Sequence, residues 1–414
     1  MYEKVNERSE ALDDRIEDIA QIVKQHYNIP DFGDPAAVTE EETVVIGRIT
    51  MDSESLSADS AKLNEASLVL EASRMMGSGA RVPLKFDPGV RIRQAVKGLK
   101  GIGLFPGAIV ALKGKNGGAG WFTVQEILSL PPLNPSQPST SSEPFSMMVA
   151  CGPYTSDGDL KFGPWQTLLS KIKADSPSVV LLTGPFLDAN HPSIRTGDID
   201  TTPAEIFRTN IIEPLQSYLD SNPGSLVVMI PSVRDIISDH TVYPQAALSV
   251  ELVGDPRIQL LPNPSRFSLN GIVFAVSSVD VLFHLRKEEF TKRAAEVDSI
   301  ESPGGGEAAV DPMSNLCRHV LQQRSFYPIF PVPYDLSHEV NLDVSHSEFL
   351  DFWSNEPEKA ERPDVLILPS RLKQFVKVVD GVTAINPSFL TKATYASLRC
   401  SSGNPQAEIA RLDG

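Results

Sequence analysis

The stretch at residues 183–192, TGPFLDANHP, continues an apolar run, SVVLLTG, at residues 178–184. This run predicts a buried strand, because a strand covered on both faces is apolar along its whole length. Gly184, Asp188 and His191 follow directly after it. Carboxylate and imidazole groups just beyond a strand can bind metal ions, so the stretch raises the hypothesis of a metal centre.

Apolar runs of the same kind recur through the second half of the chain and alternate with helical patterns. The further strands are expected at residues 146–151, 225–231, 271–280, 363–370 and 382–387. The helices are expected at residues 165–175, 203–221, 313–324 and 371–379. This alternation predicts an α/β domain whose sheet is covered on both faces. The glycine-rich segment at residues 302–312 is expected to be a surface loop within it.

The first half of the chain has a different pattern. Leu12, Ile16, Ile19, Val23 and Tyr27 are spaced as on one face of a helix, which predicts an amphipathic helix that docks on the rest of the chain. Short strands separated by glycine-rich turns follow and predict an OB fold. A segment with five prolines and four serines then separates the halves. The expected domains are a helix and connector (1–42), an OB fold (43–130), a linker (131–145) and the α/β domain (146–414).

Composition limits the function classes. The 414 residues carry a net charge of −16, which disfavours a general affinity for nucleic acid. The charge is uneven, because residues 1–40 hold ten acidic and four basic residues while residues 45–130 hold seven acidic and eleven basic ones. No apolar run is long enough for a membrane span, and three well-separated cysteines argue against a disulfide framework or zinc ribbon.

Lys113 and Lys115 flank the turn of a predicted hairpin, KGKNGGAGW, at residues 113–121. Such a hairpin can contact single-stranded nucleic acid where aromatic side chains lie nearby to stack on bases. The two lysines are therefore candidate nucleic-acid contacts. A solvated basic surface explains the same lysines without any ligand.

The order of the strand ends resembles that of calcineurin-like metallophosphoesterases, in which Asp, His and Asn side chains hold two metal ions. In that resemblance Gly-Asp-x-x-Asp follows the second strand, and here Pro185 occupies the position of the bridging aspartate while Asp188 remains. Proline offers no ligand atom, and Arg234 repels a cation at the position of another ligand. The positions that correspond to the vestigial site are Pro153, Pro185, Asp188, Arg234, Asp235, His284 and Ser370. We therefore expect no catalytic residue, no metal and no cofactor.

The remaining polar residues at the strand ends have structural explanations. Asp188 and Asp235 are expected to cap turns or helix starts, and Arg234 with Asp235 could form an internal ion pair. His284 is expected to be a hydrogen-bonded, partly buried histidine. Cys151 ends a strand, but no basic residue nearby in the sequence would activate it as a nucleophile.

Several stretches, in order along nearly the whole chain, resemble the B subunits of the eukaryotic replicative DNA polymerases, the polymerase alpha branch above all. They are MYEK (1–4), LFPGAIV (104–110), VACGPYTSD (149–157), GPFLDANH (184–191), PSVRD (231–235), VYPQ (242–245), LFHL (282–285), QRSFYP (323–328), PDVLILPS (363–370) and NPSFLTK (386–392). Family members usually carry a further N-terminal helical domain and a tether, and the chain is expected to begin after them.

This resemblance implies a nuclear, non-catalytic scaffold that supports the initiation of DNA replication. Its implied partners are the zinc-bearing C-terminal domain of the catalytic subunit of polymerase alpha and, within the larger complex, primase. Tyr243, Phe326, Tyr327 and Tyr334 are candidate interface anchors, with packing inside the domain as the competing explanation. The alternatives are a single-strand-binding OB module and an active metallophosphoesterase with unusual ligands.

Overall fold

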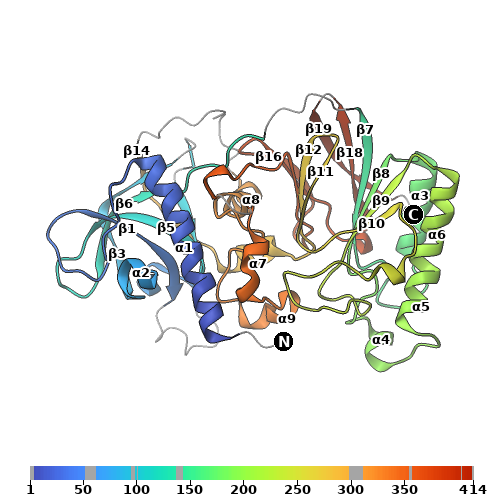
Figure 1. Cartoon of the computed structure of the whole chain (residues 1–414), viewed down its shortest axis with the longest axis horizontal. Helices are drawn as coiled ribbons and strands as arrows, with labels where there is room; N and C mark the ends of the chain where they lie inside the picture. Colours follow the sequence, from blue (N-terminus) through green and yellow to red (C-terminus); the bar gives the residue numbers. More distant parts are fainter. Residues whose placement is uncertain are drawn as a thin grey trace.

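A computed structural model describes residues 4–51, 62–94, 98–99, 101–136, 143–297, 311–353, 357–401 and 403–412 of the chain. An OB-fold domain with the N-terminal helix forms one end, and a two-sheet α/β domain forms the other (Figure 1). The predicted fold class, an N-terminal helix followed by an OB fold and an α/β domain with helices flanking its sheets, is confirmed. Helices α7 (Val281–Glu288) and α8 (Pro312–Gln322) lie between the two ends.

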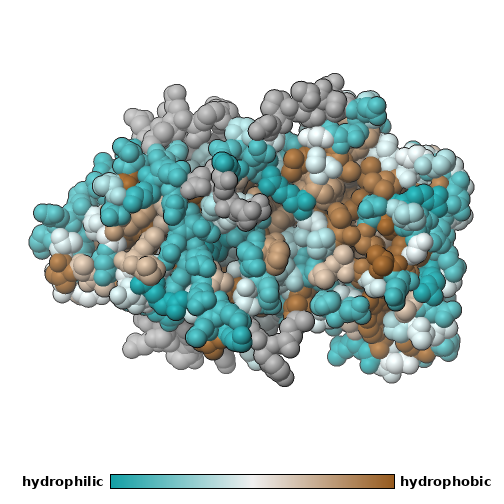
Figure 2. Space-filling view, viewed as in Figure 1, coloured by the Kyte–Doolittle hydropathy of each residue, from teal (hydrophilic) through white to brown (hydrophobic). Residues whose placement is uncertain are grey.

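Helix α1 (Val5–Tyr27) docks on the OB fold, as its apolar spacing predicts. Its buried residues pack against side chains of the OB sheet, including Ile46 and Ile109. Its other side is charged, and the surface on this side of the molecule is largely hydrophilic (Figure 2). The helix ends at Asn28, whose left-handed backbone lets its N–H bond to the Lys24 carbonyl. Within the described ranges, no helix has the length and apolar character needed to cross a membrane.

The OB sheet closes on itself. Its strands are β1 (Thr43–Met51), β2 (Leu68–Glu71), β3 (Arg81–Arg93), β5 (Ile109–Lys115) and β6 (Phe122–Leu128). They pair in the order β3-β2-β1-β5-β6, and β6 pairs again with the long strand β3. Side chains along β3 and along the start of β6 alternate between buried and more exposed positions. The buried ones pack in the interior as part of the core.

Two strand pairings join the ends of the molecule. Strand β4 (Gly101–Leu104) of the OB half pairs with β13 (Phe290–Arg293), and β14 (Ala295–Val297) pairs with the end of β3. These partners are about 200 residues apart in sequence, so no local pattern predicts the pairings. The expected surface loop at residues 302–312 lies outside the described residues, apart from Asp311 and Pro312 at the start of α8.

The α/β domain consists of two sheets packed face to face. The first has the order β10-β9-β8-β7-β18-β19, and the second has the order β11-β12-β15-β17-β16. One apolar core between them contains Val149 and Leu181 from the first sheet and Phe274 and Ile367 from the second. The strands of the first sheet are β7 (Phe145–Cys151), β8 (Val179–Thr183), β9 (Leu226–Ile230), β10 (Ile258–Leu260), β18 (Thr394–Ser401) and β19 (Asn404–Arg411). Those of the second are β11 (Ser265–Leu269), β12 (Ile272–Val276), β15 (Val365–Ile367), β16 (Phe375–Val379) and β17 (Val382–Asn386).

Helices cover the outer face of the first sheet. They are α3 (Gly163–Asp175), α5 (Pro203–Phe207) and α6 (Glu213–Ser221), and a π-helical turn joins the last two. Their apolar residues, such as Trp165 and Leu215, form a second core with the sheet. The predicted covering of both faces of the strands is therefore correct, with the second sheet covering one of them. Three short helices complete the described set: α2 (Arg74–Gly77), α4 (Pro192–Thr196) and α9 (Ser337–Val340).

The helix predicted at residues 371–379 is wrong. This segment contains β16, which pairs antiparallel with β17. Asp380 and Gly381 both have positive φ, at 49° and 81°, as in the tight turns that join two strands in a hairpin. The valines at 376, 378 and 379 favour a strand, and this Asp-Gly turn decides the structure in favour of the hairpin.

The two ends share one continuous core, so the junction is a packed seam. OB residues such as Leu104 and Phe105 belong to the same cluster as Leu316 and Ile329. The Gln323 side chain extends this packing with two hydrogen bonds to Ile109, one from its Nε2 to the carbonyl and one from the N–H to its Oε1, both at 3.0 Å. The segment after the OB fold also packs here, because Leu133 is buried in this core.

Candidate functional site at the strand ends

The loops that follow β7, β8 and β9 lie in direct backbone contact. A Cβ atom on Gly152 would lie 2.0 Å from the Pro185 carbonyl oxygen, and one on Gly184 would lie 2.6 Å from the Ser232 backbone nitrogen. Pro153 and Pro185 follow these glycines through cis peptide bonds. Glycine is required at both positions because only a residue without Cβ allows such an approach. Backbone atoms thus fill the space between these strand ends.

Asp235 fastens these loops together. Its side chain is buried and accepts hydrogen bonds from the backbone N–H groups of Phe186, Leu187 and Ser232. Burial raises the pKa of Asp235 to about 7, and the three N–H donors oppose that rise. The carboxylate bridges the loops after β8 and β9, so its role is structural.

Arg234 forms an ion pair with Asp188, where the sequence suggested a pair with Asp235. Its Nε lies 3.2 Å from Asp188 Oδ1, and its Nη2 contacts the other carboxylate oxygen. Asp188 is 6% exposed, so the pair is largely shielded from water. Neighbours along the chain point to different places here, because Asp235 turns inward to the β8 loop while Arg234 extends across it.

His191, the last polar residue of the opening stretch, fastens the same loop. Its Nδ1 accepts the Ser193 N–H at 3.2 Å and so caps α4, and its Nε2 lies 2.9 Å from the Ser156 carbonyl oxygen. The ring is buried. Both ring nitrogens are engaged, which leaves none for a metal ion.

His284 lies in the buried part of α7 and has two partners. Its Nδ1 is 2.8 Å from the Tyr327 hydroxyl, and its Nε2 is 3.5 Å from Glu339 Oε2. Burial would raise the pKa of Glu339, but His284 and Arg371 together lower it to about 2. Arg371 also contacts Asp280, with 3.1 Å between Nε and Oδ2. The sequence singled out His284 but gave no signal for Glu339, and it suggested Tyr327 only as a candidate interface anchor; both partners lie about 50 residues away along the chain.

Ser370 and Cys151, which also lie at strand ends, are both buried. Ser370 is fully buried, its Oγ accepts the Leu372 N–H at 3.1 Å, and its own N–H donates to Asn386 Oδ1 at 2.9 Å. Burial raises the pKa of the Cys151 thiol to about 12, so the thiolate needed of a nucleophile is strongly disfavoured.

These residues do not fit a two-metal centre. Such a centre needs several oxygen and nitrogen donors that face one space. Asp188 faces a guanidinium, Asp235 faces backbone N–H groups, and His284 faces a hydroxyl and a carboxylate. Across the residues that the structure describes, no three His, Cys, Asp or Glu side chains gather as a potential metal site. We call Asp188, Arg234, Asp235 and His284 the strand-end cluster.

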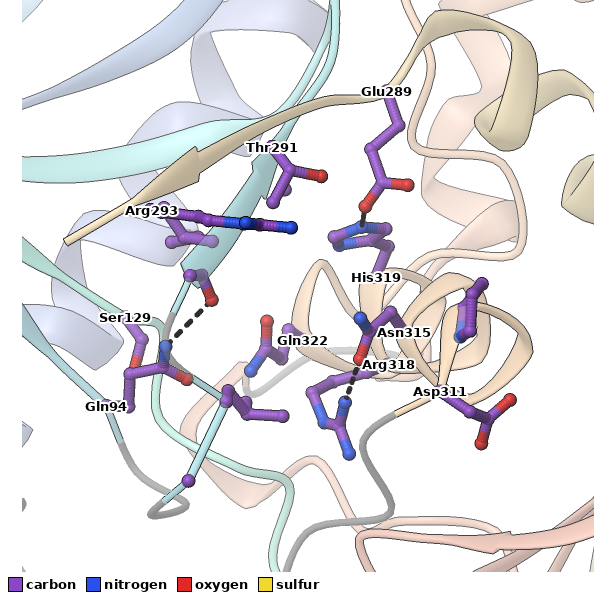
Figure 3. A pocket seen from close by; sticks show the side chains of 16 residues that line it. Gln94, Ser129, Glu289, Thr291, Arg293, Asp311, Asn315, Arg318, His319 and Gln322 are labelled. Carbon is purple, nitrogen blue, oxygen red and sulfur yellow. Dashed lines mark hydrogen bonds and ion pairs between the residues drawn. The ribbon is translucent and has the colours of Figure 1, made fainter. Parts of the chain in front are cut away.

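A polar cavity of about 480 Å³ lies at the seam, and no residue of the strand-end cluster lines it. Strands β4 and β13 line one side and α8 lines the other (Figure 3). His319 Nε2 and Glu289 Oε1 are 2.8 Å apart across it, and the absence of a side chain on Gly103 leaves room for this pair. Sequence reasoning missed these residues, because the β4–β13 pairing that brings them together has no local signal.

Lys113 and Lys115 lie on β5, near the turn predicted to join it to β6. Each lysine forms an ion pair at 2.9 Å with an acidic residue of the connector after α1, Lys113 with Glu42 and Lys115 with Glu40. The acidic N-terminal segment and the basic OB segment of the sequence thus offset each other in space. Arg74 and Asp13 make a third such pair.

Two models of known protein families match separate parts of the chain. The family model for the B subunit of DNA polymerases alpha and epsilon matches residues 147–377. A second model, for the OB domain of the DNA polymerase alpha B subunit, matches residues 9–130. The chain belongs to the family of DNA polymerase alpha B subunits. The OB match includes most of α1, which agrees with the packing of that helix on the OB sheet.

Relatives in this family extend the similarity over almost the whole chain. The DNA polymerase alpha B subunit of Schizosaccharomyces pombe is 36% identical over 96% of the chain, which covers 67% of that protein. The B subunits of Rattus norvegicus and Saccharomyces cerevisiae are 30% and 32% identical over 95% of the chain, which covers 59% and 58% of them. The chain therefore spans about three fifths to two thirds of the length of these relatives.

Proposed function

We propose that this chain is a non-catalytic accessory subunit of the DNA polymerase alpha–primase complex. It binds the C-terminal domain of the catalytic subunit, joins primase within the larger complex, and supports the initiation of DNA replication in the nucleus. The observation that carries the proposal is membership of the B-subunit family over both the OB and the phosphoesterase-like parts.

The state of the strand ends supports a role without catalysis. Chemistry in an open α/β sheet takes place beyond the carboxyl ends of its strands. Here Asp235 accepts hydrogen bonds from three backbone N–H groups, and Asp188 forms an ion pair with Arg234. The loops that contain Gly152 and Gly184 are in direct contact with neighbouring backbone. Groups committed in this way cannot bind metal or substrate without dismantling the loops.

The packed seam supports a role as a platform. One core runs from the OB sheet into the α/β domain, and the Gln323–Ile109 pair links the halves. Both halves therefore present a single rigid surface to a partner. Of the four aromatic residues suggested as anchors, Tyr243, Phe326 and Tyr327 are buried inside the chain, whereas Tyr334 is 95% exposed. Phe349, at 65% exposed, is a further candidate anchor.

Co-expression with the C-terminal domain of the catalytic subunit tests the proposed binding. We expect a 1:1 complex on gel filtration, and a weaker one when Tyr334→Ala and Phe349→Ala are combined. The matched control is Met75→Ala with Val378→Ala, because these two apolar side chains are also exposed, at 84% and 64%. Two separate species with the wild-type chain would overturn the binding proposal. Equal weakening in both double variants would remove Tyr334 and Phe349 from it.

A phosphodiesterase assay with added Mn²⁺ tests the absence of catalysis. We expect no hydrolysis of a model phosphodiester by the purified chain, and no difference between it and the Asp188→Asn variant. Hydrolysis that depends on Mn²⁺ and disappears in Asp188→Asn would overturn this part of the proposal, whatever the co-expression result.

A further inference from the structure

The connector between α1 and β1 lies across the end of the β5–β6 hairpin. The Thr39 N–H donates to the Asn116 carbonyl at 2.8 Å, and Asn116 Nδ2 donates to the Pro35 carbonyl at 3.0 Å. Asn116 is buried, and Val38 reaches Gly118. Uncharged hydrogen bonds therefore hold the connector in place. We call residues 113–121 the hairpin tip.

The charged contacts between the connector and the hairpin tip are of a different kind. Glu40 is 80% exposed and Glu42 is 50% exposed, while the lysines they pair with are 37–40% exposed. Exposed pairs of this kind contribute little to stability and are screened by salt. The two carboxylates can therefore leave the lysines at little cost while the connector stays bound through Asn116.

The surroundings of the tip suit a phosphodiester chain with bases. The Lys85 ammonium lies 3.2 Å from the centre of the half-buried Trp121 ring, and the exposed Arg91 lies on the same strand as Lys85. Lys113 and Arg91 share one surface depression of about 250 Å³ with the carboxylates of Glu42, Asp87 and Glu126. Arg91 Nη2 lies 3.6 Å from Glu126 Oε2, so a phosphate group would also compete with that carboxylate. Cations beside an aromatic ring are the combination that binds single strands, through phosphates and base stacking.

We propose that the hairpin tip is a contact site for single-stranded nucleic acid that the carboxylates of Glu40 and Glu42 screen. Phosphate groups compete with these carboxylates for Lys113 and Lys115, and Trp121 offers a ring for one base. The screening keeps affinity low for an isolated strand, so contact depends on a strand held nearby at high local concentration. This activity is separate from the proposed binding of the catalytic subunit, and either can fail without the other.

Fluorescence anisotropy with a labelled oligo-dT strand of about 20 nucleotides, which is longer than an OB fold covers, tests the proposal. The full chain is titrated at several salt concentrations. Combining Glu40→Gln with Glu42→Gln should tighten binding about threefold to tenfold at low salt and steepen the salt dependence. Adding Lys113→Glu and Lys115→Glu to that variant should abolish the gain. Trp121→Ala should weaken binding, and Trp121→Phe should retain most of it.

A matched control separates local screening from the general field of an acidic chain. Glu205→Gln with Glu213→Gln changes the net charge equally on exposed residues of α5 and α6, at the far end of the molecule (Figure 1). We expect no tightening in this control. Equal tightening in both double variants, or none in the Glu40/Glu42 variant while its thermal unfolding is unchanged, would overturn the proposal.

Discussion

The strand-end cluster and the hairpin tip use the same residue types to opposite effect. Asp188 and Arg234 at the strand ends form a largely shielded ion pair, and Glu40 with Lys115 at the tip forms an exposed one. In the first pair, removing one partner leaves the other as a buried charge without a counter-ion, which is destabilising. In the second pair, water replaces the removed partner, so stability changes little. Burial therefore decides which charges are fixed parts of the fold and which remain available to a ligand.

The stretches that resemble the family lie together as pairs in space. GPFLDANH meets PSVRD where Asp235 accepts the N–H groups of Phe186 and Leu187. LFHL meets QRSFYP at the contact between His284 and Tyr327, and LFPGAIV meets QRSFYP at the Gln323–Ile109 pair. Each of these contacts joins segments that are far apart in the chain. Together they hold the parts of the fold rigidly to one another.

The largest expected effect is the loss of Asp235. Asp235→Ala leaves three buried N–H groups without an acceptor, and each unsatisfied group costs about 1–3 kcal/mol, so we expect a loss of about 4 kcal/mol in the free energy of unfolding. Urea denaturation measures it. Asp235→Asn keeps one carbonyl acceptor and should lose less. A loss below about 1 kcal/mol for the alanine variant would show that the buried polar contacts of the strand-end cluster matter no more to stability than the exposed ion pairs of the hairpin tip.

Substitution of Gln323 tests whether a buried but uncharged hydrogen-bonding side chain is also important for stability. Gln323→Ala leaves both the N–H and the carbonyl of Ile109 unpaired in the seam, and we expect a loss of about 2–3 kcal/mol. The neighbouring Gln322→Ala is the control, because that side chain lines the seam cavity and is only partly buried. Chemical denaturation of the two variants should separate them by more than about 1 kcal/mol. Equal losses would show that the seam does not depend on this amide.

The pH dependence of stability sharpens the assignment of Asp235. Its pKa is about 7 in the folded chain and lower in the unfolded chain, so between roughly pH 4 and 7 the folded state holds a proton that the unfolded state has lost. Its contribution to stability is therefore present at low pH and is lost as the pH rises through about 7, with a slope of at most about 1.4 kcal/mol per pH unit. Asp235→Asn should remove that part of the slope in urea titrations across this range. A slope that is the same in wild type and Asp235→Asn would contradict the raised pKa of Asp235 in the folded chain.

The sequence predicts most of the elements because their signals are local. Apolar runs predict β7, β8 and β9, and the spacing of Ile16, Ile19 and Val23 predicts α1. The error at β16 has the same origin, since Phe375, Val376 and Val379 also fit a helical spacing, and only the Asp-Gly turn that follows them favours a hairpin. The β4–β13 and β3–β14 pairings depend on contacts between distant segments and have no periodic signal.

The contacts of the candidate site were only partly predictable from the sequence. Pro185 stands where the resembled phosphoesterases have their bridging aspartate, and the absence of a metal centre that this substitution suggests stays a prediction. The partner of Arg234 was not predictable, because Asp235 is its neighbour in the chain and Asp188 is its neighbour in space. The connector over the hairpin tip was suggested only by opposite charge in two segments, which does not say which residues meet.

The smallest expected effect concerns the stability of the hairpin tip. Combining Glu40→Gln with Glu42→Gln should lower the free energy of unfolding by less than about 1 kcal/mol, because both ion pairs are exposed, and the difference should vanish in high salt. Asn116→Ala should cost more, about 1–2 kcal/mol, because its buried amide donates to the Pro35 carbonyl of the connector and accepts the Gly118 N–H within the hairpin tip. Thermal and urea unfolding of the two variants measure this order. If the charge variant were the less stable of the two, the connector would be held by its carboxylates, and they could not yield the lysines to a phosphate.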